Sequence, residues 1–267
     1  MFWGWAARRR RRAILAEPFP LEWEAIFERG VRLAARLPIE HQQRLRQLTQ
    51  IFVAEKSWEG LRGLAVTEEM KIVIAAHACL LVVAMPEEIH FDQVLSVLIQ
   101  PTGYVARGIE MIGGGIVEGR QARIGQTGWR EPVVVSWRDA RAAGRGETPG
   151  RNVVLHEFAH QLDMLNGRFT DGTPTMKNRE QAERWAQVME PEFQDLVESC
   201  RRDRPTLIDC YGATNRTEFF AVTTEVFFEQ PVLLRRYHPD LYEVLRTYFR
   251  LDPAVWRGLR GDDDEEE

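Results

Sequence analysis

The residues best suited to chemistry are His156, Glu157 and His160 in the segment NVVLHEFAHQLDMLNG, which runs from Asn152 to Gly167. Two histidines four residues apart lie on one face of a helix, with their Cβ atoms about 5–6 Å apart. From that separation two imidazole nitrogens can bind one Zn²⁺ ion at about 2.0–2.1 Å. Glu157 is rotated by about 100° around the helix axis, so it is no ligand but can reach a metal-bound water. This H-E-x-x-H arrangement is typical of zinc proteases.

The alternative is an ordinary amphipathic helix that carries two histidines by chance. The flanking residues weigh against it, because Val153, Val154, Leu155 and Phe158 make the helix strongly apolar. Unpaired imidazoles are costly in apolar surroundings, so two of them need a partner. Asn152 and Gly167 are suitable residues to begin and end such a helix. We therefore interpret the segment as a metal-binding helix.

A catalytic zinc site needs a third protein ligand beyond the two histidines. The extended pattern H-E-x-x-H-x-x-G-x-x-H is excluded, because the chain has Asp163 and Asn166 where that pattern requires Gly and His. Asp163 shares the face of the two histidines but lies too far along the helix axis to complete the site. We expect Asp163 to hydrogen-bond a ligand histidine or a neighbouring loop.

A remote carboxylate is available in the segment YGATNRTEFFAVTTEVFFEQP. Asn215 and Thr214 are suitable helix N-cap residues, and Glu218 is the third residue after Asn215, where a glutamate often reaches back to the cap amide. Glu218 and Glu225 are seven residues apart and so share one face of a helix rich in Phe and Val. Because a carboxylate pair on a buried face requires a cation, we predict Glu218 as the ligand and Glu225 as a supporting acid. Asp209 is the less favoured substitute.

Two segments together resemble one known family. HEFAHQLD, followed some fifty residues later by DCYGATNRTEFFAVTTEVFFEQP, is similar to the Mlc titration factor A family of bacterial cytoplasmic zinc metallopeptidases. The segment EPVVVSWRDA also matches, and the resemblance covers about residues 20–255. The family in turn resembles gluzincins with an unusually distant glutamate ligand, as in anthrax lethal factor.

The resemblance implies a role for each candidate site residue. His156, His160 and Glu218 would bind one zinc ion per chain, Glu157 would act as general base and acid, and Tyr211 would assist. Without the resemblance, Tyr211 would be interpreted as a structural tyrosine under a helix start. The role expected of Tyr211 is to donate a hydrogen bond to the oxyanion of the reaction. His238 is the other candidate for this role, although RRYHPDLYEVL is more typical of a loop and a first helical turn.

The resemblance implies a peptidase that acts on peptide substrates, with aminopeptidase action as the family's activity. The alternative is a zinc-containing regulator that binds and sequesters a transcriptional repressor of the Mlc type without needing proteolysis. Pure sequestration would not require Glu157, so we favour the peptidase.

The fold class predicted is α+β, mostly helical, with a small mixed sheet beside the histidine helix. Helical patterns dominate from Leu21 to Met85 and again from about residue 179. Short apolar or alternating runs separated by Gly and Pro predict strands in DQVLSVLIQP, EMIGGGIVEGRQARIGQ and EPVVVSWRDA. We expect residues 17–260 to form a single domain, because the chain contains no clear linker and no internal repeat.

The two ends of the chain are expected to be tails: a basic disordered tail over residues 1–16 and an acidic one over residues 261–267. In the first, the apolar residues precede Arg8–Arg12, which is the reverse of a secretory signal. We expect a solvated tail without function; the alternative is contact with anionic lipid through Phe2, Trp3 and Trp5.

The composition of the chain disfavours several other classes of protein. The net charge of −5 is small for 267 residues and disfavours direct nucleic-acid binding. The longest apolar run, Ile72 to Met85, is shorter than the roughly 20 residues that span a bilayer, so we expect a buried helix capped by Thr67 and no transmembrane segment. His77 within it is expected to be a core histidine whose hydrogen bonds are satisfied.

The three cysteines form no C-x-x-C pair, which favours a reduced, cytoplasmic protein with Cys210 as a lone thiol.

Overall fold

Helices dominate the part of the chain that the computed structural model describes, residues 2–86, 90–102, 132–167 and 170–256. The α-helices are α1 (Phe2–Ala16), α2 (Leu21–Gly30), α3 (Ile39–Glu55), α4 (Glu68–Leu80), α5 (Trp137–Arg145), α6 (Val153–Asp163), α7 (Arg179–Arg201), α8 (Arg216–Glu229), α9 (Pro231–Tyr237) and α10 (Pro239–Phe249). Short 3-10 turns are η1 (Ala34–Arg36), η2 (Met164–Asn166), η3 (Cys210–Ala213) and η4 (Pro253–Val255). With one small sheet, they make an α+β domain, as predicted.

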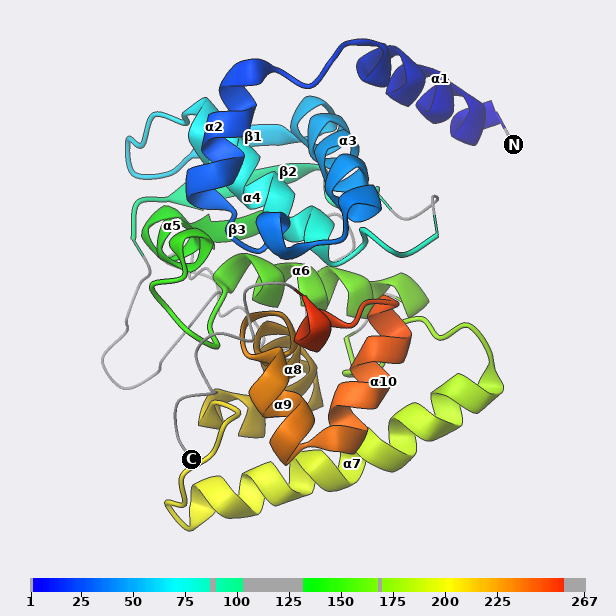
Figure 1. Cartoon of the computed structure of the whole chain (residues 1–267), viewed down its shortest axis with the longest axis vertical. Coiled ribbons are helices and arrows are strands. Elements are labelled where there is room, and N and C mark those ends of the chain that lie inside the picture. The colour runs from blue at the N-terminus through cyan, green and yellow to red at the C-terminus, as the bar shows by residue number, and fades with distance from the viewer. Residues whose placement is uncertain (1, 87–89, 103–131, 168–169, 257–267) are drawn as a thin grey trace.

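Helix α4 is the centre of the N-terminal group of helices, and α2, α3 and α5 pack around it (Figure 1). The Thr67 side chain accepts a hydrogen bond from the Met70 amide, which confirms the predicted cap. The helix is buried all round from Ile72 to Leu80, which explains its continuous apolar sequence. In its last turn, His77 donates through Nδ1 to the Val73 carbonyl at 2.8 Å.

The described sheet contains β1 (Ser57–Gly60), β2 (Ser96–Gln100) and β3 (Val133–Ser136), in that order. Both neighbouring pairs are parallel, so the strands described are not the mixed sheet that was predicted. Parallel pairing follows from the connections, since α4 lies between β1 and β2 in the chain. Strand β1 was also missed, because its four residues directly follow the helical pattern of α3.

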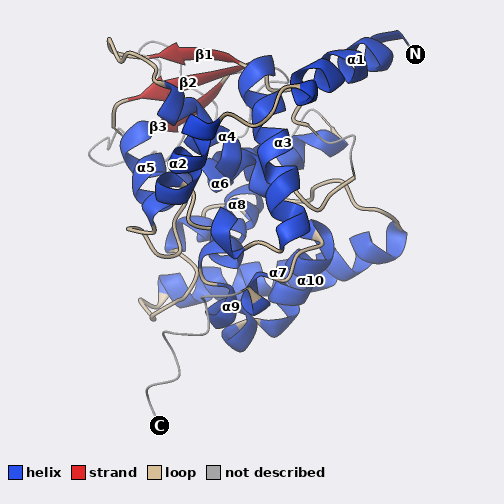
Figure 2. Cartoon of the chain, turned by 45° about the horizontal axis from the view of Figure 1, so that its top comes forward, coloured by secondary structure: helices blue, strands red, loops and turns tan. Residues whose placement is uncertain are grey.

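The basic N-terminal segment is helix α1 and not the disordered tail that was predicted (Figure 2). The segment is ordered by a tertiary contact: α1 packs on α3, and the Arg11 guanidinium forms two hydrogen bonds to Glu55 at 2.8 and 3.1 Å. A long-range ion pair of this kind gives no signal in the local sequence.

The C-terminal group consists of α7 to α10, with α8 at its centre (Figure 1). Every residue of α8 from Phe219 to Glu229 is buried, so its aromatic side chains pack in several directions. Phe228 contacts Phe249 of α10, and Phe220 contacts Trp185 of α7. Helix α6 lies between the two groups and contacts α4, α8 and β3, so it is held from both sides.

Cys200 and Cys210 form a disulfide between the end of α7 and η3, with their Cα atoms 5.7 Å apart. The prediction that Cys210 is a lone thiol is therefore wrong. The two cysteines are ten residues apart and meet because the chain turns back after α7 to place η3 beside its end, so their pairing has no C-x-x-C signature. The pairing also removes two of the three unpaired cysteines on which the expectation of a reducing compartment was based. Cys79 is the free, buried cysteine among the described residues.

Within the described residues, none of the helices has the length and apolar character needed to cross a membrane. The strand predicted in EMIGGGIVEGRQARIGQ and the acidic tail at residues 261–267 lie outside the described residues.

Candidate metal centre

The two histidines of the candidate site are presented by α6. Its N-cap is Asn152, whose side chain accepts from the Leu155 amide at 3.2 Å, as the sequence predicted. Leu155 and Phe158 are fully buried and anchor the helix against the core. The rings of His156 and His160 project from the same side of α6, with centroids 4.9 Å apart and planes at 87° to one another.

The carboxylate that faces these rings is Glu218 in the first turn of α8. Its backbone amide donates to the N-cap Asn215 at 3.0 Å, while its side chain extends toward α6. Glu218 Oε2 lies 3.1 Å from Nε2 of His156 and 3.5 Å from Nε2 of His160. The carboxylate therefore does not return to the cap amide, which was the alternative that the sequence left open.

The three side chains have the composition and spacing of a zinc site. Their potential ligand atoms all lie within 4.8 Å of one another. Two atoms bound to one tetrahedral zinc at about 2.0–2.1 Å are about 3.3 Å apart, and the two histidine–carboxylate distances of 3.1 and 3.5 Å bracket that value. The site is largely shielded from solvent, with side-chain exposures of 3% for His156, 15% for His160 and 14% for Glu218. The residues present thus fit the metal.

Glu225 orients His156 from behind. Its Oε1 accepts from Nδ1 of His156 at 2.8 Å, so Nε2 is the nitrogen left to face Glu218. Its Oε2 accepts from the Asn152 backbone amide at the start of α6. A carboxylate on the second ring nitrogen fixes the tautomer and orientation of a ligand histidine.

The support continues one step further into the core. The Asn152 amide group donates to Glu229 at 2.9 Å, and Glu229 pairs with Arg32 at 2.7 Å. Glu225 and Glu229 are both buried, so these contacts offset the cost of two interior carboxylates. They connect the N-terminal group of helices to α6 and α8.

Glu157 lies beside the cluster on the neighbouring face of α6. The pKa of its carboxyl is raised to about 8, chiefly by burial; the positive charge of His156 opposes this shift, and the negative charges of Glu218 and Glu225 add to it. A carboxyl with a pKa near neutrality can both accept and donate a proton at physiological pH.

Tyr211 is carried by η3, and its ring centroid lies 5.9 Å from that of His156. Asp209 holds the turn by accepting from the Tyr211 amide at 2.8 Å, and it pairs through its other oxygen with Arg151. Burial raises the pKa of the Tyr211 phenol, and the charges of Glu218 and Glu157 and a hydrogen bond to Glu218 raise it further. Tyr211 therefore stays protonated and remains a hydrogen-bond donor.

The other candidates do not join the cluster. Asp163 accepts from the amides of Gly172 and Thr173 at 2.8 and 3.0 Å, which is the neighbouring-loop contact that was expected as one of two possibilities. Asp209 supports η3 as described above. His238 lies at the start of α10 and pairs with Glu192 of α7 at 2.8 Å.

Comparison with known proteins defines the class. Residues 5–250 match the family model described as glucose-regulated metallo-peptidase M90, and the chain belongs to this family. The match spans both groups of helices and includes every residue of the candidate centre.

Individual relatives are similar to this chain over most of its length. An uncharacterized protein from Synechocystis sp. is 33% identical over 248 residues, covering 92% of this chain and 90% of its own. Mlc titration factor A from Cronobacter sakazakii is 32% identical over 261 residues, covering 97% of this chain and 94% of its own. Mlc titration factor A from Yersinia enterocolitica is 30% identical over 258 residues, covering 95% and 92%. The resemblance stated from the two motifs is thereby confirmed.

Proposed function

We propose that this protein is a zinc-dependent peptidase in which His156, His160 and Glu218 bind the metal and Glu157 is the general base. The observation that carries the proposal is the convergence of the two Nε2 atoms on Glu218 Oε2, at 3.1 and 3.5 Å. Glu157 follows His156 directly in α6, and its pKa responds to the charges of His156 and Glu218. Two imidazoles and one carboxylate are a donor set that catalytic zinc sites use.

Zinc in such a site supplies a Lewis acid that lowers the pKa of water toward about 7 and polarises a carbonyl group. Glu157 takes a proton from the attacking water and passes it to the leaving amine, which requires a carboxyl with a pKa near neutrality. Tyr211 donates a hydrogen bond to the carbonyl oxygen as negative charge develops on it. Glu225 keeps His156 in the orientation that leaves Nε2 free.

The substrate proposed is an extended peptide lying along β3. In the described sheet β3 is a terminal strand, and it contacts α6, so a chain paired with it would run beside the histidine helix. Backbone pairing at a sheet edge is a common way to hold a peptide. The narrower proposal of aminopeptidase action rests on the family resemblance alone.

A second candidate function is regulation by binding. It is favoured by the names of two relatives, because 'Mlc titration factor' describes a protein that binds the repressor Mlc. In this alternative the chain would contain zinc but sequester a repressor of the Mlc type without cleaving it. Both candidates are proposed for the cytoplasm, where a repressor works.

The substitution Glu157→Gln separates the two candidates. Because Glu157 is not a proposed ligand, the variant should retain its zinc, while loss of a general base should reduce peptide cleavage by on the order of 10²–10⁴-fold. Metal content by mass spectrometry and cleavage of a fluorogenic peptide library are the two measurements.

Glu218→Ala is the comparison variant, since it changes the other glutamate of the proposed site, the one that binds the metal. This variant should lose its zinc as well as its activity. Normal cleavage by Glu157→Gln would assign the base elsewhere. Zinc without cleavage in the unaltered protein would favour the regulator, and a protein purified without zinc that fails to take it up would remove the site.

A further inference from the structure

Helix α1 has one face covered by the rest of the molecule. Ala7, Arg11 and Ile14, spaced four and three residues apart, are its half-buried side chains, and α3 is the element against which it packs. Arg11 contacts Glu55 and Asp92 on this side. These contacts hold α1 in a defined position against the body.

The opposite face of α1 is open. Trp5, Arg8, Arg9, Arg12 and Leu15 are all exposed, and spacings of three and four residues place them on one side of the helix. Trp5 is 64% exposed and Leu15 is 37% exposed, so apolar surface lies on the same side of the helix as the arginines. Figures 1 and 2 show α1 standing out from the body beyond α3, which is consistent with the exposure of these five side chains.

The open face has unbalanced positive charge. Within the described residues, Arg8 and Arg12 have no ion-pair partner, and Arg9 lies over the Trp5 ring at 5.8 Å. Arg10 and Arg11 are both paired with Glu55, and Arg11 is also paired with Asp92. The whole chain has a net charge of −5, whereas α1 holds five consecutive arginines and no acidic residue. Positive charge is thus concentrated at one end of an acidic protein, which directs that end toward anionic surfaces.

We propose that the open face of α1 is a docking surface for an anionic phospholipid membrane. Its arginines match the charge of phosphate headgroups, and a tryptophan with an exposed leucine beside them are interfacial anchors. A nucleic acid would use the arginines but would have no use for Leu15. The helix is about 22 Å long at 1.5 Å per residue and would lie along the membrane surface. This inference is independent of the metal centre.

The test is co-sedimentation of the purified full-length protein with vesicles. The protein should bind vesicles of mixed phosphatidylglycerol and phosphatidylcholine, should not bind pure phosphatidylcholine, and should be released by salt. Each arginine near an anionic surface contributes about fivefold in affinity, so Arg8→Gln, Arg9→Gln and Arg12→Gln combined should weaken binding by on the order of 100-fold.

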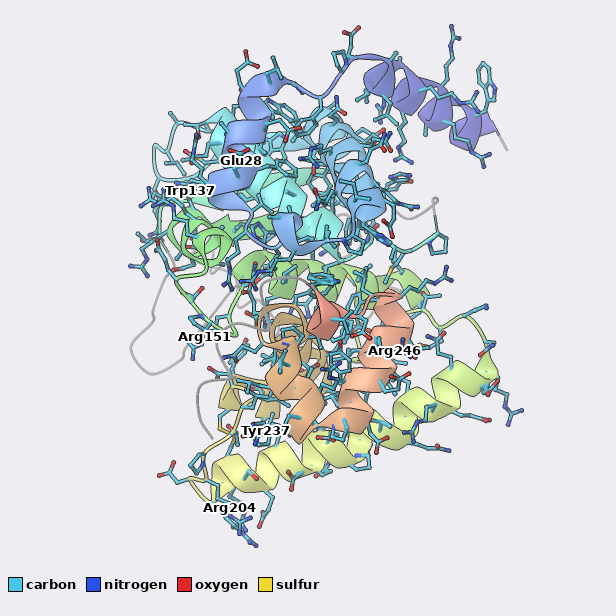
Figure 3. The ribbon with its side chains drawn as sticks, in the orientation of Figure 1. Glu28, Trp137, Arg151, Arg204, Tyr237 and Arg246 are labelled. Carbon is cyan, nitrogen blue, oxygen red and sulfur yellow. A yellow bond between two sulfur atoms is a disulfide. The ribbon has the colours of Figure 1, made fainter. Side chains whose placement is uncertain are left out.

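The matched control is Arg204→Gln, Arg235→Gln and Arg236→Gln combined, which removes the same charge from exposed positions. Arg204 lies at the end of the molecule far from α1 (Figure 3). This variant should bind like the unaltered protein. Equal binding by the two triple variants, or failure of the unaltered protein to bind the mixed vesicles, would overturn the proposal.

Trp5→Ala tests whether the partner is lipid or any polyanion. It should weaken vesicle binding, because an interfacial anchor is lost while the charge is unchanged. Unchanged vesicle binding by Trp5→Ala, together with binding of duplex DNA that depends on Arg8, Arg9 and Arg12, would replace the membrane by a nucleic acid and overturn the proposal.

Discussion

Tyr211 illustrates how single residues acquire their positions around the candidate centre. Its amide is held by Asp209, its ring lies near His156, and its phenol is kept protonated by burial and by the charges of Glu218 and Glu157. His238, the rival donor, is instead paired with Glu192 on α7. A donor that cannot ionise near neutrality is suited to stabilise a developing oxyanion.

We therefore expect Tyr211→Phe to retain its metal and its fold while kcat falls by about 10²–10³-fold and KM changes little. His238→Ala, which removes a donor outside the cluster, should have a much smaller effect. Steady-state kinetics of both variants on one peptide, with metal content measured in parallel, are the check. A larger loss in His238→Ala than in Tyr211→Phe would transfer the role to His238.

At the scale of elements, η3 is a short turn whose position depends on its neighbours. The Cys200–Cys210 disulfide ties it to the end of α7, and Arg151 before α6 pairs with Asp209. Gly212 packs close to Leu196 of α7, where an added Cβ would lie 3.3 Å from Cδ2. A 3-10 turn of four residues has little stability of its own, so these ties determine where Tyr211 lies.

Replacing both Cys200 and Cys210 by Ser should lower the free energy of unfolding by about 2–3 kcal/mol, because the disulfide closes a loop that the unfolded chain would otherwise explore. Peptide cleavage should fall as well, since η3 loses one of its ties. Urea unfolding of the metal-free protein with and without a dithiol reductant is the measurement. The unaltered protein in reductant should approach the double variant, and identical curves in the two conditions would contradict the expectation.

At the scale of the whole molecule, the candidate centre lies where two groups of helices meet across α6 (Figure 1). The N-terminal group is packed closely enough that a Cβ on Gly144 of α5 would lie 2.0 Å from the Gly30 carbonyl oxygen of α2 and 3.2 Å from the His77 ring. His77 is fully buried there, and its Nε2 has no hydrogen-bond partner among the described residues.

Burial lowers the pKa of His77 from 6.5 to about 4, so the unfolded chain binds a proton there before the folded one does. The stability contribution of the neutral ring is therefore complete above pH 6.5 and is lost as the pH falls toward 4. At about 1.4 kcal/mol per pKa unit, the unaltered protein should lose about 3 kcal/mol relative to His77→Gln between pH 7 and pH 4. Denaturant unfolding of both metal-free proteins measures this difference, in which the acid titration of other groups cancels. Parallel pH profiles would show that His77 does not titrate in this way.

Local sequence was sufficient for the elements that carry the chemistry. The caps Asn152, Thr67 and Asn215 and the apolar runs behind them predicted α6, α4 and α8 correctly, because capping and helical periodicity involve residues within four positions of one another. The same local geometry brought His156 and His160 to one face. The polar pattern of α8 predicted Glu218 and Glu225 on a shared face, and both contact His156.

Tertiary structure alone decided the contacts between distant residues. Glu218 could have reached its own cap amide, and the packing of α8 on α6 is what places it against the histidines instead. The series of contacts from Glu225 through Asn152 and Glu229 to Arg32 gives no sequence signal, because its members come from three distant parts of the sequence. Strand β1, the ordering of α1 against Glu55 and the Cys200–Cys210 pair have the same origin. Each is stabilised by a partner whose distance in space is unrelated to its distance along the chain, so only the folded molecule determines it.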